Sequence, residues 1–145
     1  MFFDYEIIGG DFSNAGQASS SVKKVLKQLN VDPKVIKRVV VCLYEAEVNV
    51  VAHAFSGKIF VDIDTERIVM RLQDTGPGIP DIPMAMQMGY STASAEVREM
   101  GFGAGMGLPN INNNADEFKI NSIVGEGTNV EIVVYFDGES YERGR

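Results

Sequence analysis

The sequence is poor in the residues that build metal clusters and disulfide frameworks. Its 145 residues include one cysteine, Cys42, one histidine, His53, and no tryptophan. A single cysteine excludes a disulfide framework and a thiolate zinc cluster, and a single histidine excludes a His-rich metal site. The chain also lacks a long apolar run and a charged-then-apolar leader, so we expect no membrane segment and a cytoplasmic location.

Basic residues are also fewer than acidic ones. The chain carries 13 basic and 20 acidic residues, a net charge of −7, and has no contiguous basic block. Nucleic acid is therefore not an expected partner, because phosphate binding needs clustered Lys and Arg. An acidic body can still contact the basic patch of a protein partner. The length and the 45% hydrophobic content fit one soluble domain, expected over 1–137, with a frayed polar tail over 138–145.

The hydrophobic pattern predicts an α+β two-layer sandwich. The order is β-α-α-β-β-loop-β-β, with helices covering one face of a mostly antiparallel sheet. Segment 80–115 is rich in Met, Gly, Ser and Asn, and we expect a helical turn or two over 83–88. Its later part is too rich in glycine for a stable helix and is interpreted as a functional lid or binding loop. Strands are expected at 2–8, 59–63, 68–72, 118–123 and 130–136, and helices from 14–17 to 29 and from 33 to about 54.

An acid followed by two glycines ends one of these strands. Asp74 follows the apolar run 68–72 and precedes Gly76 and Gly78. A carboxylate at the end of a buried strand is costly unless it is paired, and glycines let the backbone approach a flat ligand. The pattern indicates the floor of a nucleotide site, with the acid accepting a hydrogen bond from an exocyclic amine. A plain strand-turn is the alternative.

The second helix carries a file of polar residues, Glu45, Asn49 and His53, four residues apart and surrounded by apolar positions. Such a file is either a solvated helix face or a ligand site. The oxygen of Asn49 can bind Mg²⁺, and Glu45 can accept a proton from a hydroxyl or a water that attacks a phosphate. Glu47 falls near the apolar stripe, so either the helix is wrapped on both sides or Glu47 reaches solvent.

Two further signals are glycine-rich. Segment 101–110 has glycines at alternate positions, which expose consecutive N–H groups and can form an anion site; a floppy surface loop is the alternative. It is neither a Rossmann fingerprint nor a P-loop, because the spacing is wrong and no Gly-Lys-Ser/Thr follows. Gly127-Thr128 places a hydroxyl at the start of a strand that could lie beside Asp74.

Taken in order, these motifs resemble a known set. Glu45-x-x-x-Asn49, Asp74-x-Gly76-x-Gly78, Gly103-x-Gly105-x-Gly107 and Gly127-Thr128 are similar to the N, G1, G2 and G3 boxes of the GHKL (HATPase_c) ATPase superfamily. A chain this short resembles the stand-alone branch, the anti-sigma factor serine-protein kinases and related switch kinases. The resemblance implies a Bergerat ATP-binding fold, with a mostly antiparallel mixed sheet and ATP under a mobile lid.

The resemblance also implies roles for individual residues. Glu45 is the expected general base, Asn49 the Mg²⁺ ligand and Asp74 the acceptor for the adenine amine. Thr128 is expected to support the adenine through water. The implied nucleotide-binding set is Asn49, His53, Asp74, Gly76, Gly78, Ile79, Met88, Ser91, Thr92, Gly103, Ala104, Gly105, Met106, Gly107, Leu108 and Thr128.

The chain departs from the family pattern at three places. His53-Ala54 stands where the family often has His-Gly, and Glu47 stands where a small or apolar residue is usual. Segment 93–100 is longer than in the most similar switch kinases. None of these departures removes a nucleotide ligand.

The resemblance implies an ATP/Mg²⁺-dependent protein serine/threonine kinase of a partner-switching system. Its expected substrate is a small STAS-domain anti-sigma factor antagonist, through which a sigma factor is regulated. One alternative is a nucleotide-sensing module that sequesters a regulator without phosphorylating it. Another is an orphaned histidine-kinase catalytic domain, which has less need of a glutamate base. A homodimer that uses the N-terminal strand, with Phe2, Phe3 and Phe12, is possible, but ordinary core packing explains these residues too.

Overall fold

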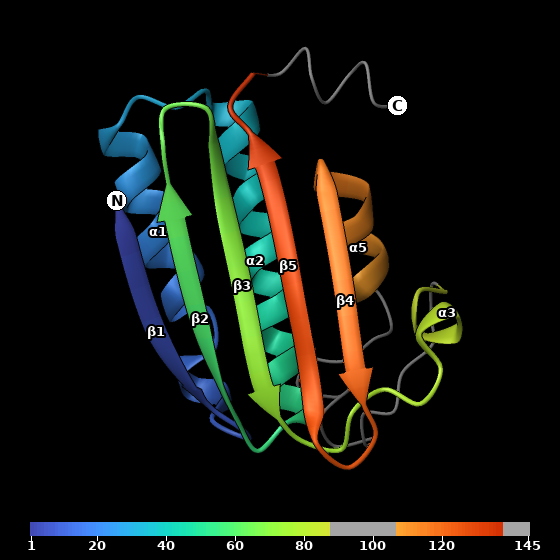
Figure 1. Cartoon of the computed structure of the whole chain (residues 1–145). Coiled ribbons are helices and arrows are strands. Elements are labelled where there is room, and N and C mark those ends of the chain that lie inside the picture. The colour runs from blue at the N-terminus through green and yellow to red at the C-terminus, as the bar shows by residue number, and fades with distance from the viewer. Residues whose placement is uncertain (88–106, 138–145) are drawn as a thin grey trace.

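The computed structural model describes residues 1–87 and 107–137. Five strands form one sheet in the order β1-β2-β3-β5-β4, and helices α1, α2 and α5 cover one face of it (Figure 1). The strands are β1 (Phe2–Ile8), β2 (Ser56–Ile63), β3 (Arg67–Thr75), β4 (Glu117–Ile123) and β5 (Gly127–Tyr135). The helices are η1 (Phe12–Asn14), α1 (Gln17–Gln28), α2 (Pro33–His53), α3 (Ile82–Ala85) and α5 (Gly107–Asn114).

The sheet confirms the predicted two-layer α+β sandwich. All four pairings between these strands are antiparallel, so the sheet is more regular than the expected mixed one. Side chains alternate between the two faces, and the inward residues of β3, Ile68, Met70 and Leu72, are buried beneath the helices. The core therefore lies between the sheet and α1, α2 and α5.

Helix α2 starts and ends as the sequence predicts. Asp32 caps it, accepting a hydrogen bond of 2.8 Å from the N–H of Lys34, and Pro33 occupies the first helical position. The helix ends at His53, because Ala54 is extended with φ −104° and ψ 168°. Any residue adopts that conformation, so alanine serves where the family often has glycine.

Glu47 is buried, with 3% of its surface exposed, so α2 is wrapped on both sides and Glu47 does not reach solvent. Its carboxylate accepts hydrogen bonds from the N–H groups of Gly16 (3.0 Å), Ala18 (3.2 Å) and Ser19 (3.3 Å). These donors belong to the first turn of α1, whose N-terminal N–H groups have no partner within the helix. The acid that departs from the family pattern therefore caps a neighbouring helix, and its negative charge also suits that helix end.

We expect Glu47→Ala to destabilise the fold by about 2–4 kcal/mol, because it leaves three backbone N–H groups buried without a hydrogen-bond acceptor. Glu47→Gln should cost less, because the amide oxygen still accepts while the charge is lost. Chemical denaturation measures both. Glu6→Ala, at an exposed position of β1, is the matched control. Equal stability of Glu47→Ala and the control would contradict the capping role.

Helix α5 corrects one prediction. The later part of segment 80–115 was expected to be too rich in glycine for a helix, yet residues 107–114 are helical. Burial overrides intrinsic propensity here, because Leu108, Pro109 and Ile111 pack into the core. In the earlier part, the expected helical turn forms as α3, with Asp81 accepting a hydrogen bond of 3.0 Å from the N–H of Met84.

An ion pair fixes the far end of α5. Arg38 of α2 donates through Nε to the carbonyl of Asn114 and through a second nitrogen to Asp116, both at 3.0 Å. Asp116 also accepts a hydrogen bond of 2.7 Å from the N–H of Tyr135 in β5. A cation at a helix C-terminus is favourable, so this network holds α5 against both α2 and the sheet.

The N-terminal strand forms one edge of the sheet. Phe2 is exposed, whereas Phe3 and Phe12 pack against the core, so only Phe2 of these three is available to a partner. Within the described residues, no helix combines the length and apolar character needed to cross a membrane.

Candidate functional site

Four residues from neighbouring strands form a row across the helix-covered face of the sheet, where β3 ends. They are Gly57, Asp74, Thr128 and Ser122. Asp74 continues the inward file of β3 and lies opposite Gly57 of β2. On its other side comes Thr128 of β5, which pairs with Ser122 of β4. A Cβ on Gly57 would lie 2.9 Å from Val50 of α2, which confirms that this row faces the helices. The core thus gives way to a polar row at this end of the sheet.

Asp74 is held by its neighbour in the row. Its Oδ1 accepts a hydrogen bond of 3.0 Å from the N–H of Thr128, so Thr128 lies beside Asp74 as predicted. No donor among residues 1–87 and 107–137 bonds Oδ2. Burial raises the pKa of the Asp74 carboxyl above its ordinary value, and the Thr128 hydrogen bond partly offsets that shift. This half-buried carboxylate is the kind of acceptor that an amine donor would satisfy.

The loop after Asp74 is fastened to the β4–β5 hairpin. The N–H of Gly125 donates to the carbonyl of Pro77 at 2.9 Å, and the N–H of Ile79 donates to Oγ of Ser122 at 2.7 Å. Ser122 also bonds Thr128 through their hydroxyls at 2.9 Å. The G1-like and G3-like motifs, far apart in the sequence, therefore form one hydrogen-bonded unit.

Two glycines in this unit cannot carry a side chain. Gly78 has φ +75°, and a Cβ there would lie 2.5 Å from the carbonyl oxygen of Ile123. Gly127 has φ +152°, and its Cβ would lie 2.0 Å from the carbonyl oxygen of Asp74. Both glycines thus serve the close approach of the loop to the hairpin.

The polar file of α2 faces the start of α5. Glu45 accepts a hydrogen bond of 3.3 Å from Nδ2 of Asn110, and a Cβ on Gly107 would lie 3.6 Å from its other oxygen. Asn49 and His53 follow at successive turns and are half-buried. Burial lowers the pKa of His53, so the neutral imidazole is favoured. The three polar residues thus run along one side of α2 from α5 towards the end of β3.

Asp74 and Glu45 lie near opposite ends of the C-terminal half of α2: Asp74 on β3 beside its last turn, and Glu45 on the helix itself. Gly76, two residues after Asp74, packs against Ala54, since a Cβ on it would lie 2.9 Å from the Cα of that residue. Glu45 precedes Ala54 by nine residues, which places it roughly 13 Å back along the helix axis, at about 1.5 Å per residue. Asn49 lies between them.

The predicted phosphate-binding segment is described only at its end. Gly107 and Leu108 are the first residues of α5, and the side chain of Leu108 is buried in the core, so only its backbone can face a ligand. No group of three His, Cys, Asp or Glu within the described part of the chain could hold a metal ion. The predictions for Met88, Ser91, Thr92, Gly103, Ala104, Gly105 and Met106 lie outside the described residues, as does segment 93–100.

Sequence reasoning missed Ser122. It is the residue that joins the loop, β4 and β5, yet it read only as a polar position in an expected strand. The expected turn over 125–128 hides this pairing, because the turn in the structure spans 124–126, and counting outward from it places Ser122 opposite Thr128.

Comparison with known proteins gives a family. Residues 11–134 match the model of the histidine kinase-like ATPase domain. The serine/threonine-protein kinase RsbT of Bacillus subtilis is 32% identical over 127 residues, covering 85% of this chain and 87% of that protein. An anti-sigma F factor of Thermoanaerobacter is 29% identical over 131 residues, covering 87% and 88%. One of Caldanaerobacter subterraneus is 30% identical over 127 residues, covering 84% and 85%.

The match spans every described strand and helix except the N-terminal strand and the last residue of β5. This family's domain implies ATP binding, and the acid, glycines and threonine of its boxes meet at one end of the sheet. The chain therefore belongs to the histidine kinase-like ATPase family, the GHKL superfamily, and within it to the partner-switching serine/threonine kinases.

Proposed function

We propose that the protein is an ATP/Mg²⁺-dependent serine/threonine kinase that phosphorylates a small STAS-domain protein and thereby regulates a sigma factor or similar target. The observation that carries this proposal is the placing of two carboxylates near opposite ends of the C-terminal half of α2. Asp74 lies on β3, where Gly76 packs against Ala54 at the end of α2, and Glu45 lies on α2 beside α5, roughly 13 Å back along the helix axis from Ala54. That separation leaves room for the ribose and phosphates of ATP between the proposed adenine site and the proposed general base.

The residues present fit ATP. Asp74 and Thr128 would hold the adenine, with Gly76, Gly78 and Ile79 shaping the loop beside it. The phosphates would lie towards Gly107 and Leu108, where the first N–H groups of α5 have no partner within the helix. Asn49 would supply the protein ligand to Mg²⁺, which is commonly bound by one or two protein groups together with phosphates and water. The bound metal would neutralise phosphate charge during transfer.

Glu45 would act as the general base. The partner protein supplies the serine or threonine hydroxyl, and Glu45 would take its proton as the oxygen attacks the terminal phosphorus of ATP, whose bond to the bridging oxygen breaks so that ADP leaves. The hydrogen bond from Asn110 fixes one oxygen of Glu45 and leaves the other towards Gly107.

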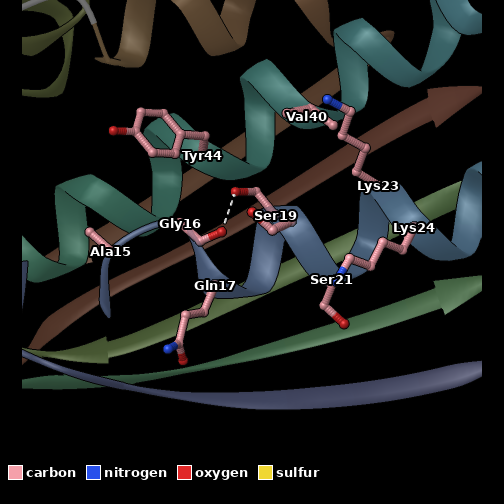
Figure 2. Close-up of a pocket in the computed structure, with 10 residues that line it drawn as sticks. Ala15, Gly16, Gln17, Ser19, Ser21, Lys23, Lys24, Val40 and Tyr44 are labelled. Carbon is pink, nitrogen blue, oxygen red and sulfur yellow. Dashed lines mark hydrogen bonds between the residues drawn. The ribbon is translucent and has the colours of Figure 1, made fainter. Parts of the chain in front are cut away.

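A groove between α1 and α2 is our candidate for docking the partner. Lys23 and Lys24 rise from α1, and Val40 and Tyr44 from α2 (Figure 2). Five exposed lysines lie within 23–37 against one acid, although they form no contiguous block; they are Lys23, Lys24, Lys27, Lys34 and Lys37. On a chain of net charge −7, such a surface suits an acidic stretch of a protein.

We expect the double change Lys23→Glu and Lys24→Glu to weaken binding of the partner at least tenfold, mainly through slower association, and to leave ATP affinity unchanged. Surface plasmon resonance at two salt concentrations measures the effect. The double change Lys58→Glu and Lys119→Glu, at exposed positions of β2 and β4, is the matched control because it makes the same change of charge on the uncovered face of the sheet. Equal loss in both variants would show a general charge effect instead of a docking site.

The proposal is tested by incubating the protein with ATP, Mg²⁺ and a small STAS-domain protein from the same organism, then locating phosphate by mass spectrometry. Phosphoserine or phosphothreonine on the partner is expected. Phosphohistidine, acid-labile and alkali-stable, would instead support the histidine-kinase alternative. The relatives named anti-sigma F factor favour a second candidate, an ATP-dependent binder that sequesters a regulator. Nucleotide-dependent complex formation without phosphate transfer would support it.

The remaining proposals concern organisation. We propose that 1–137 forms the single kinase domain, that 138–145 is a tail, and that the protein acts in the cytoplasm. Pairing of two β1 edges, with Phe2 exposed beside them, is the proposed route to a homodimer.

A further inference from the structure

Ser122 occupies the centre of the hydrogen-bond network beneath the proposed base site. Its hydroxyl oxygen accepts from the N–H of Ile79 at 2.7 Å, lies 2.9 Å from the hydroxyl of Thr128, and donates to the carbonyl of Gly127 at 3.2 Å. The four family-like motifs do not include this residue. The question is how its single proton is used.

The protons of the network can be counted. The N–H of Ile79 can only donate and the carbonyl of Gly127 can only accept. Ser122 has one hydroxyl proton and two acceptors within reach, the carbonyl of Gly127 and the hydroxyl of Thr128. Both hydrogen bonds can form together only if Ser122 donates to Gly127 and Thr128 donates to Ser122. Thr128 is largely buried, with 6% of its surface exposed, so an arrangement that satisfies both hydroxyl protons within the protein is favoured.

We propose that Ser122 is a positioning residue that makes the Thr128 hydroxyl an acceptor only, and so helps the site select a base that carries an exocyclic amine. With its proton committed to Ser122, Thr128 offers lone pairs to the base or to a bridging water. Ionised Asp74, which bonds the N–H of Thr128, is also an acceptor only. Two adjacent acceptors favour an amine donor and oppose a carbonyl at the same place.

This inference rests on the proposed function, because it takes Asp74 to mark the base site. In Ser122→Ala the Thr128 proton loses its partner and can turn towards the base. A carbonyl at the amine position then finds a donor. Discrimination between ATP and inosine triphosphate, which carries a carbonyl there, should therefore fall by about five- to tenfold, the value of one ordinary hydrogen bond.

Isothermal titration of the whole protein with ATP and with inosine triphosphate tests this. Ser122→Thr keeps the hydroxyl and should keep the wild-type preference for ATP. Ser122→Cys replaces it with a weak donor and should show a partial loss, which keeps the inference testable if the alanine variant does not fold. Loss of the preference in Ser122→Ala, with rescue in Ser122→Thr, is the expected result.

If Ser122 had a purely structural role, Ser122→Ala would lower the affinities for ATP and inosine triphosphate by the same factor. An unchanged ratio of the two affinities would therefore overturn the inference. An unchanged affinity for both nucleotides in Ser122→Ala would overturn it too. Failure of the proposed nucleotide site is a separate outcome, because the wild-type protein would then bind neither nucleotide. Failure of phosphate transfer alone would leave this inference standing, because it concerns binding.

Discussion

Asp74→Asn should abolish measurable ATP binding while the fold persists. Asparagine keeps an oxygen for the N–H of Thr128, which bonds Oδ1 at 3.0 Å in the present structure. Its amide nitrogen, however, would replace the second carboxylate oxygen and place a donor against the adenine amine. The variant loses a charge-assisted hydrogen bond and sets two donors against each other. Together these changes should weaken the free energy of ATP binding by about 3–4 kcal/mol, which lowers the affinity at least a hundredfold. Isothermal titration with ATP and Mg²⁺ measures it.

The stability of the same variant separates binding from folding. The pKa of Asp74 is raised in the fold, mainly by burial, so the folded protein holds this proton more tightly than the unfolded chain. Ionisation at neutral pH therefore costs folding free energy, which is regained as the pH falls through the raised pKa. We expect Asp74→Asn to have an equal or higher melting temperature in the absence of ATP. A large drop would mean that Asp74 serves the fold instead of a ligand.

The pH dependence of binding should run in the opposite direction. The wild-type protein should lose affinity for ATP as the pH is lowered through the raised pKa of Asp74, because the protonated carboxyl is a poor acceptor. The loss should begin at a higher pH than for a carboxyl with the ordinary value of 3.8. Gln73→Asn, at the neighbouring exposed position, is a control for general effects of substitution at the end of β3.

The regular elements could be predicted from the sequence because their signals are local. Asp32-Pro33 marks the start of α2, and the alternation of apolar residues marks β3 and β5. The meeting of Asp74 with Thr128 was also within reach, since the family boxes occur in a fixed order. The register that joins Ser122 to both was missed, because it depends on pairing across a hairpin and not on residue type.

Two features lay beyond local reasoning. The first is α5, whose glycine and four asparagines predict a loop; its helix is selected by burial of Leu108, Pro109 and Ile111 against α2. The second is Glu47, whose partners lie about 30 residues earlier in the sequence. No periodicity reveals an acid that caps the N-terminus of another helix, because the interaction exists only once the two helices have packed.

Glu45→Gln should abolish phosphate transfer and leave ATP binding nearly unchanged. Glutamine keeps the shape and an oxygen that can accept the 3.3 Å hydrogen bond from Asn110, but it cannot accept the proton of the attacking hydroxyl. General-base catalysis contributes about 10²–10⁴-fold, so single-turnover transfer to the partner should slow by that factor. Glu45→Ala should behave in the same way. Rapid-quench measurement of partner phosphorylation gives the rate, and titration with ATP gives the affinity.

Asn110→Ala is the matched control, since it removes the neighbour of Glu45 and keeps its carboxylate. If Asn110 only orients Glu45, the rate of phosphate transfer should fall far less in Asn110→Ala than in Glu45→Gln. Full activity in Glu45→Gln would sink the assignment of the base and return attention to the nucleotide-sensing alternative, which needs no proton acceptor. The decisive comparison is therefore transfer rate against ATP affinity: a base changes the first alone, whereas a residue that merely shapes the pocket changes both.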